Sequence, residues 1–131
     1  KIADVQARAT EARLRERVTQ YWQSLQDGQY ETTYALMDPF FRSKRDFKTY
    51  LNSTGAIKYH RYQVGQIVQK GNLARVQIEI ESSVPEFKLP NGKIISQPLK
   101  AIKLWETWLF MNDNWYREYY DELAEKSSTS Y

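Results

Sequence analysis

Alternating aromatic and apolar residues near the C-terminal end constrain the fold of this chain more than any other feature. Over residues 99–111 large apolar side chains recur at nearly every second position, and the pattern resumes at Trp115 after Asn112-Asp113-Asn114. Successive side chains of a β-strand point to opposite faces, and Asn and Asp favour tight turns. The pattern therefore predicts a hairpin of two long strands that closes a curved sheet.

The first third of the chain has helical periodicity. Residues 3–26 contain no glycine or proline, and their apolar residues recur at helical spacing, so we expect a long helix that ends at Gly28. A second helix is expected over residues 29–37. A third is expected over residues 44–52, with Ser43 as its N-cap.

Strand periodicity begins at residue 59 and is clearest over residues 74–81, where apolar and polar residues alternate strictly. Gly65 is expected to form a bulge in the first strand. Residues 82–98 carry three prolines and the turn sequence Pro90-Asn91-Gly92, which together predict a projecting hairpin. Its apolar residues would fold over a pocket mouth, meet a second subunit, or pack on the edge of the domain itself.

Helices followed by strands are typical of an α+β domain, in which N-terminal helices pack on a bent antiparallel sheet. A chain of 131 residues is long enough for one domain with a single core. We expect residues 1–13 to be a helical extension or linker, residues 14–121 to be the domain, and residues 122–131 to be a flexible tail.

Composition excludes several function classes. The chain has no cysteine and one histidine, which argues against thiolate zinc sites, cysteine nucleophiles and histidine-based triads. It has no glycine-rich phosphate loop or dinucleotide fingerprint, so no metal or cofactor is expected. A net charge of +3 is ordinary for a small domain, and nucleic-acid binding is not expected. No apolar run is long enough to span a membrane.

Several short segments resemble the nuclear transport factor 2-like superfamily. They are residues 21–25 in the first predicted helix, 27–30, 34–42, and 115–118, within a resemblance that covers about residues 14–121. The resemblance implies a nuclear transport factor 2-like or cystatin-like cone, in which a strongly bent sheet is closed by helices around an apolar pocket. The superfamily includes isomerases, dehydratases, epoxide hydrolases, transport adaptors and non-enzymatic domains of exported or membrane-anchored proteins, so the fold does not decide the activity.

Glu106 is the candidate catalytic residue. A carboxyl group in an apolar pocket can act as a general acid or base, with a tyrosine hydroxyl holding the substrate's oxygen. The opposite side of the same strand is nearly as apolar, so Glu106 is alternatively a solvated residue or one paired near Lys103 or Arg117. The residues that share its side of the strand are Ile102, Leu104, Trp108 and Phe110.

Two further groups of residues are candidates for binding. In the fold that the resemblance implies, aromatic side chains would line the pocket, with ordinary core packing as the alternative: Tyr21, Trp22, Tyr34, Trp108 and Phe110. A set of cations would bind an anionic glycan, phosphate or lipid head group, with a solvated surface as the alternative. The members of this set are Arg42, Lys44, Arg45 and Arg61.

These observations favour a non-catalytic accessory domain that binds a protein partner or a small apolar ligand. We expect it in an exported, periplasmic or membrane-tethered protein with an upstream anchor, and a cytoplasmic location is the alternative. The alternative function is a small cofactor-free isomerase, lyase or hydrolase that acts on an apolar molecule, with Glu106 as acid–base and Tyr21 or Tyr34 as hydrogen-bond donor. A homodimer through the open sheet face, with Arg75, Gln77 and Glu79 buried between subunits, is compatible with the first function.

Overall fold

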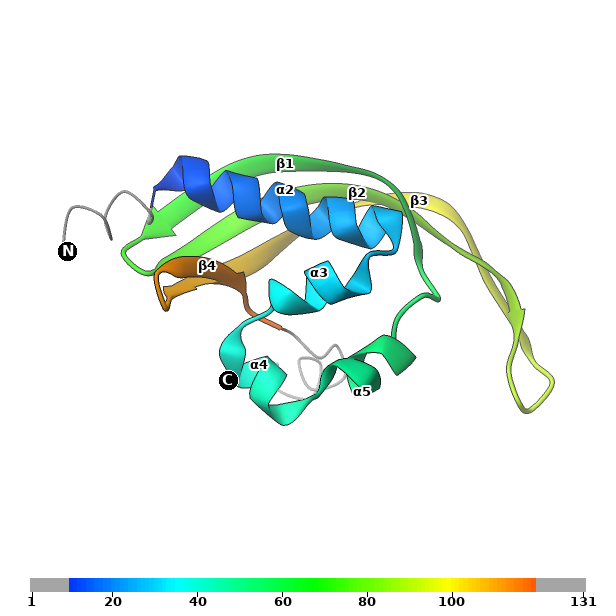
Figure 1. Ribbon diagram of the computed structural model, residues 1–131. Helices are drawn as coiled ribbons and strands as arrows, with labels where there is room; N and C mark the ends of the chain where they lie inside the picture. The colour runs from blue at the N-terminus through cyan, green and yellow to red at the C-terminus, as the bar shows by residue number, and fades with distance from the viewer. Residues whose placement is uncertain (1–9, 120–131) are drawn as a thin grey trace, which may run out of the picture.

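Helices cover one face of a curved antiparallel sheet in the computed structural model, which describes residues 10–119 (Figure 1). The helices are α2 (Glu11–Asp27), α3 (Tyr30–Ala35), α4 (Pro39–Lys44) and α5 (Phe47–Asn52). The strands are β1 (Lys58–Lys70), β2 (Leu73–Lys88), β3 (Ile94–Met111) and β4 (Asn114–Arg117). Their order in the sheet is β1-β2-β3-β4. The predicted α+β class is confirmed.

Helix α2 is bounded by residues that suit its two ends. Thr10 is extended and its hydroxyl accepts a hydrogen bond from the Arg13 backbone at 3.2 Å, so α2 begins at Glu11, and the predicted helical residues 3–9 lie outside the described residues. Gly28 ends the helix in the left-handed conformation, with φ of 71°, as predicted. The other residues of the predicted N-terminal extension, 1–9, and the predicted tail at 122–131 lie outside the described residues.

The segment after α3 forms two short helices where the sequence predicted one. Asp38 is the N-cap of α4, and its carboxylate accepts a hydrogen bond from the Phe41 backbone at 2.9 Å. Asp46 is the N-cap of α5 and accepts from the Thr49 backbone at 2.9 Å. The prediction that Ser43 caps the later helix is therefore wrong, because an aspartate three residues on takes that role.

The sheet has the alternation that the sequence predicts. Ala74, Val76, Ile78 and Ile80 of β2 are buried against the helices. The pairing of β1 with β2 shifts between Val64 and Ile67, which confirms the bulge at Gly65. The last hairpin is less symmetrical than expected, since β4 has four residues and pairs only with the end of β3.

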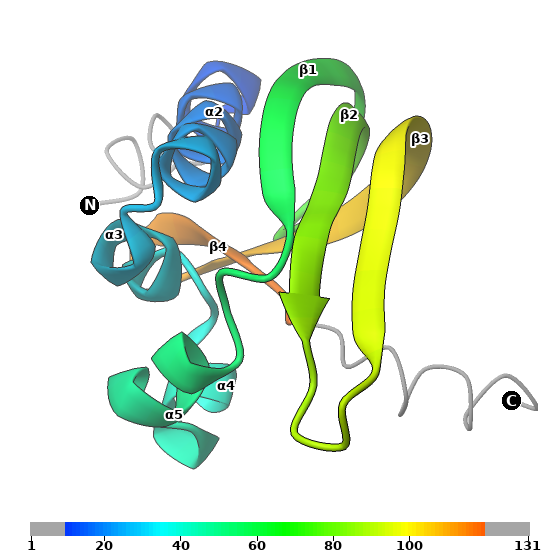
Figure 2. The ribbon, with the colours of Figure 1, turned by 90° about the vertical axis from the view of Figure 1, so that its right-hand side faces the viewer.

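The side of β3 that carries Glu106, Trp108 and Phe110 faces the helices, while Trp105 points to the opposite face and is 41% exposed. Figure 2 shows all the helices on one side of the sheet. The core therefore lies between the concave face of the sheet and α2, with contributions from the shorter helices.

Beyond the helices, β2 and β3 continue as a two-stranded arm, defined here as residues 84–98 (Figure 1). Its turn is closed by a hydrogen bond from the Gly92 backbone to Leu89 at 2.9 Å, as expected for a projecting hairpin. Phe87 and Ile94 of the arm are exposed, at 39% and 62%. The arm therefore leaves apolar surface outside the core.

Candidate functional site

The candidate acid Glu106 lies at the centre of the concave face and is 1% exposed. Its Oε1 accepts hydrogen bonds from the indole N–H of Trp22 at 3.1 Å and of Trp108 at 3.0 Å. Its Oε2 accepts from Arg117 Nε at 2.8 Å. The carboxylate is therefore enclosed by three donors, one of them positively charged.

Arg117 joins this carboxylate to the end of the sheet. It lies diagonally across the β3–β4 pair from Glu106, because its register partner is Trp108. Its guanidinium also sits 4.8 Å from the centre of the Tyr21 ring. Burial acts to lower the pKa of Arg117, but Tyr21 and Glu106 raise it, and the net direction is upward. The guanidinium therefore keeps its charge, and the ion pair stays intact.

The backbone around Arg117 ties the same cluster to the helices. The Arg117 N–H donates to Leu36 at 2.8 Å, and its carbonyl accepts from the Asp38 N–H at 2.9 Å. The link between α3 and α4 is thereby held against the end of β4. The position of the guanidinium is set by helix and sheet together.

The predicted pocket residues do not form one group. Tyr21, Trp22 and Trp108 are buried and contact one another, with ring centres 5.4 Å apart for Tyr21–Trp22 and 6.0 Å for Tyr21–Trp108. Phe110 packs on a different partner, Trp115, near the β3–β4 turn. Burial raises the pKa of the Tyr21 hydroxyl. That these residues contact a ligand stays a prediction.

Tyr34 lies apart from that cluster, between α3 and the two short helices. Its hydroxyl donates to the backbone carbonyl of Arg45 at 2.6 Å, and Arg42 offers a second carbonyl at 3.1 Å. Its ring packs 5.5 Å from Phe47 and 5.4 Å from Tyr50. The hydroxyl thus holds the α4–α5 corner in place.

Three of the four predicted anion-binding cations lie on or just after α4, and the fourth does not join them. Arg42 donates to the Met37 carbonyl at 2.9 Å, and Arg45 donates to the Tyr119 hydroxyl at 3.3 Å. Arg61 is on β1, next to Tyr62, whose hydroxyl reaches Gln23 of α2 at 2.8 Å. Because neighbouring strand residues point to opposite faces, Arg61 faces away from the helices. Anion binding by these residues stays a prediction.

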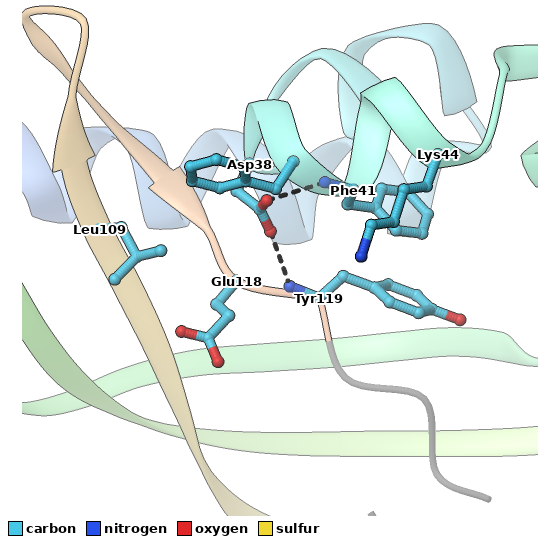
Figure 3. Close-up of a pocket in the computed structure, with 7 residues that line it drawn as sticks. Asp38, Phe41, Lys44, Leu109, Glu118 and Tyr119 are labelled. Carbon is cyan, nitrogen blue, oxygen red and sulfur yellow. Dashed lines mark hydrogen bonds between the residues drawn. The ribbon is translucent and has the colours of Figure 1, made fainter. Parts of the chain in front are cut away.

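A shallow cleft of about 360 Å³ lies beside Lys44 (Figure 3). At its floor, Asp38 accepts hydrogen bonds from the backbones of Phe41 at 2.9 Å and Tyr119 at 3.1 Å, so both carboxylate oxygens are used. Asp38 is at the same time the N-cap of α4. The cleft itself was not predicted, because its walls come from distant segments. They are Asp38, Phe40, Phe41, Lys44, Leu109, Glu118 and Tyr119.

Within residues 10–119, histidine and carboxylate side chains form no group of three or more that could hold a metal ion. Among the described helices none is long and apolar enough to cross a membrane.

Comparison with solved structures shows which known fold this chain shares. No family model matches the sequence, and no curated protein matches it. A SEC-C motif containing protein from Rhodopseudomonas palustris is similar in structure, with a TM-score of 0.55, 17% identity, and coverage of 89% of this chain and 84% of that one. A protein from Streptomyces avermitilis, named as a dehydratase of the NTF2-like family, has a TM-score of 0.50, 14% identity, and coverage of 79% and 88%.

An LEH-like epoxide hydrolase from M. tuberculosis also has a TM-score of 0.50, with 8% identity and coverage of 80% of this chain and 76% of that one. Identities this low show a shared fold and not a shared activity. The fold that the resemblance implied is confirmed: this chain has the nuclear transport factor 2-like fold.

Proposed function

We propose that this chain is a non-catalytic domain that binds a protein partner. The observation that carries the proposal is the enclosure of Glu106, whose two oxygens accept from Trp22, Trp108 and Arg117. A general acid or base must come within hydrogen-bond reach of the proton it transfers. A carboxylate that is 1% exposed and already holds three donors supports a structural role for the interior of the fold.

The exposed arm supports the partner-binding part of the proposal. Ile94 lies on the arm and Leu99 directly follows it. They are 62% and 60% exposed, and neither belongs to the core. Apolar side chains that gather on a projecting element cost solubility unless a partner covers them. Figure 1 shows the arm extending past the helices, where a partner could reach both of its faces.

The experiment compares two double variants in the native host, with the chain carrying a photo-crosslinker on the arm. Ile94→Ser with Leu99→Ser should remove the cross-linked partner and leave the melting temperature nearly unchanged, because both side chains are exposed. Leu51→Ser with Ile57→Ser is the matched control, since these apolar residues are 41% and 45% exposed but lie away from the arm. Cross-linking that survives the substitutions at Ile94 and Leu99, or that disappears equally in the control, would contradict the proposal.

The second candidate is a small cofactor-free isomerase, lyase or hydrolase that acts on an apolar molecule. Its support is the shared fold with proteins named as a dehydratase and an epoxide hydrolase. Glu106 would be the acid–base and Tyr21 or Tyr34 the donor to the substrate. In this case Glu106→Gln abolishes turnover and leaves the melting temperature nearly unchanged, which is the opposite of the outcome expected for a structural carboxylate.

The proposal includes an exported or membrane-tethered setting, which rests on the resemblance, and a homodimer through the open sheet face. Fractionation of native cells tests the first, and recovery with cytoplasmic markers would contradict it. The dimer would bury the outward-facing side chains of β2, Arg75, Gln77 and Glu79. Light scattering that gives a monomer at micromolar concentration would contradict it.

A further inference from the structure

Two arginines from different helices meet along the edge of β4 that faces away from β3. Arg17 of α2 donates from its Nε to the Trp115 carbonyl at 2.9 Å. Arg42 of α4 donates from its Nε to the Met37 carbonyl at 2.9 Å, and Met37 forms a parallel bridge with Arg117 on the same edge. A backbone carbonyl therefore holds each of the two guanidinium groups in place.

The ring of Tyr116 lies against both of these guanidinium groups. The Cζ atom of Arg17 is 5.1 Å from the ring centre, and that of Arg42 is 5.4 Å from it. An aromatic ring attracts a cation to its face, so Tyr116 further limits where the two groups can lie. The carbonyl bonds use only the Nε donors, and the Nη atoms carry more N–H groups. Both arginines are partly exposed, so a ligand in solution can reach these donors.

The positive charge of this pair is not balanced by a described carboxylate. Within residues 10–119, neither Arg17 nor Arg42 forms a salt bridge, and Arg13, one turn earlier on α2, is paired with Glu16. Burial lowers the pKa of Arg17, although Tyr116 acts in the opposite direction. The charges of Arg13 and Arg42 lower this pKa further, so the guanidinium groups are close enough to repel one another. A bound anion would relieve that repulsion.

The arrangement suits a phosphate group better than a carboxylate. A phosphate monoester carries a charge of roughly −2 at neutral pH, and its oxygens accept hydrogen bonds from several directions. A carboxylate carries a single charge, and one guanidinium can bond both of its oxygens. Arg17 and Arg42 together carry two charges and approach from two helices. The pair can therefore neutralise one phosphate dianion.

We propose that Arg17 and Arg42 bind the dianionic phosphate group of a phosphate monoester at the edge of β4. The sequence grouped Arg42 with Lys44 and Arg45, which are its neighbours in the chain, whereas the fold pairs it with Arg17 of a distant helix. The phosphate is carried by a soluble molecule or by a lipid headgroup. Figure 1 shows β4 at the opposite end of the sheet from the arm, so this site is separate from the proposed partner contact and does not depend on it.

The first test titrates the whole chain with inorganic phosphate at about pH 8, where the phosphate is a dianion. Side-chain Nε–H resonances of Arg17 and Arg42 report on the site directly, and sodium chloride keeps the ionic strength constant. These resonances shift saturably, and the melting temperature rises with phosphate because the ligand binds only the folded chain. Acetate at the same ionic strength causes neither change. The absence of saturable shifts, or equal shifts with acetate, overturns the proposal.

Substitution of single arginines supplies the matched comparison. Arg17→Gln and Arg42→Gln each weaken phosphate binding about tenfold or more, because each removes charged donors. Arg15→Gln makes the same change in net charge on α2 and leaves the affinity unchanged, since Arg15 bonds the Gly65 carbonyl on β1 at 3.3 Å. Affinity that survives either of the first two substitutions, or that falls equally in Arg15→Gln, overturns the site.

Circular dichroism checks that each variant is folded. If Arg17→Gln does not fold, Arg17→Lys takes its place. It keeps the charge but loses the planar donor group, so it also weakens phosphate binding. Unchanged affinity in this folded variant overturns the role of the Arg17 guanidinium.

The two sources of the phosphate are separated with glycerol phosphate and with vesicles. Glycerol phosphate that competes with inorganic phosphate identifies a soluble ligand. Sedimentation with vesicles of phosphatidylcholine and phosphatidic acid, lost in Arg42→Gln but not in Arg15→Gln, identifies a lipid headgroup. A chain that binds neither overturns the proposal, and retained cross-linking on the arm would then leave the proposed function standing.

Discussion

Replacing Glu106 by glutamine should cost this protein a large part of its stability. The substitution keeps the shape of the side chain but removes the charge that faces Arg117 Nε at 2.8 Å. Its single amide oxygen can serve Arg117 or the two indoles, so at least one buried donor loses its acceptor. Removing one partner of a buried ion pair costs about 3–5 kcal/mol, because the remaining charge is left uncompensated.

That loss is a fifth or more of the roughly 5–15 kcal/mol that stabilises a typical domain. For a chain of this length it corresponds to a fall of about 10–20 °C in melting temperature. Urea unfolding followed by tryptophan fluorescence gives the free energy directly, since Trp22 and Trp108 contact the carboxylate. Thermal unfolding followed by circular dichroism gives the second measurement.

Glu16→Gln is the matched control, because Glu16 makes an exposed ion pair with Arg13 at 3.5 Å. Its effect should stay within about 0.5 kcal/mol. Adding Arg117→Gln to Glu106→Gln should destabilise less than the sum of the two single changes, since no buried charge then remains. A loss below about 1 kcal/mol for Glu106→Gln, or strict additivity in the double variant, would refute the structural role of the pair.

Three further predictions follow from the same structure. Trp22→Phe should lower the free energy of unfolding more than Trp115→Phe, by about 1–3 kcal/mol, because the Trp22 indole donates to Glu106 whereas the buried Trp115 Nε1 has no hydrogen-bond partner within residues 10–119; equal losses in urea unfolding would contradict this. Gly28→Ala should cost about 1–2 kcal/mol at its φ of 71°, and Gly28→Asn less, as measured by melting temperature; no loss for alanine would count against the left-handed cap. Burial raises the pKa of Tyr50 to about 12, so its contribution to stability is fully present below its ordinary value of 10 and is lost as the pH rises through about 12; the melting temperature should fall over that range as tyrosinate absorbance rises, and a flat profile would be inconsistent with the buried hydroxyl.

Local features of the sequence predicted much of the fold. The buried side of β2, the bulge at Gly65 and the end of α2 at Gly28 each depend on residues that are neighbours in the chain. The predicted cap at Ser43 was wrong because Asp46 offered a better-placed side-chain acceptor. Competing caps within a few residues are hard to rank by spacing alone.

The candidate site, too, was predicted from the sequence only in part. The spacing of residues 102–110 placed Glu106 among apolar neighbours, and the structure puts that side of the strand against the helices. The sequence left Lys103 and Arg117 as alternative partners for it. Only the pairing of β3 with β4, which sets Arg117 diagonally across from Glu106, selects between them.

The alternating hairpin by itself determined that this chain forms a curved sheet with one buried side, because strand alternation is a local property. The tertiary structure decided what meets on that side. The indoles of Trp22 and Trp108 and the guanidinium of Arg117 converge on one carboxylate from a helix and two strands. It also decided that β4 ends early and leaves β3 with an open edge among the described residues, since strand length depends on where the chain finds its next contact, here at Asp38.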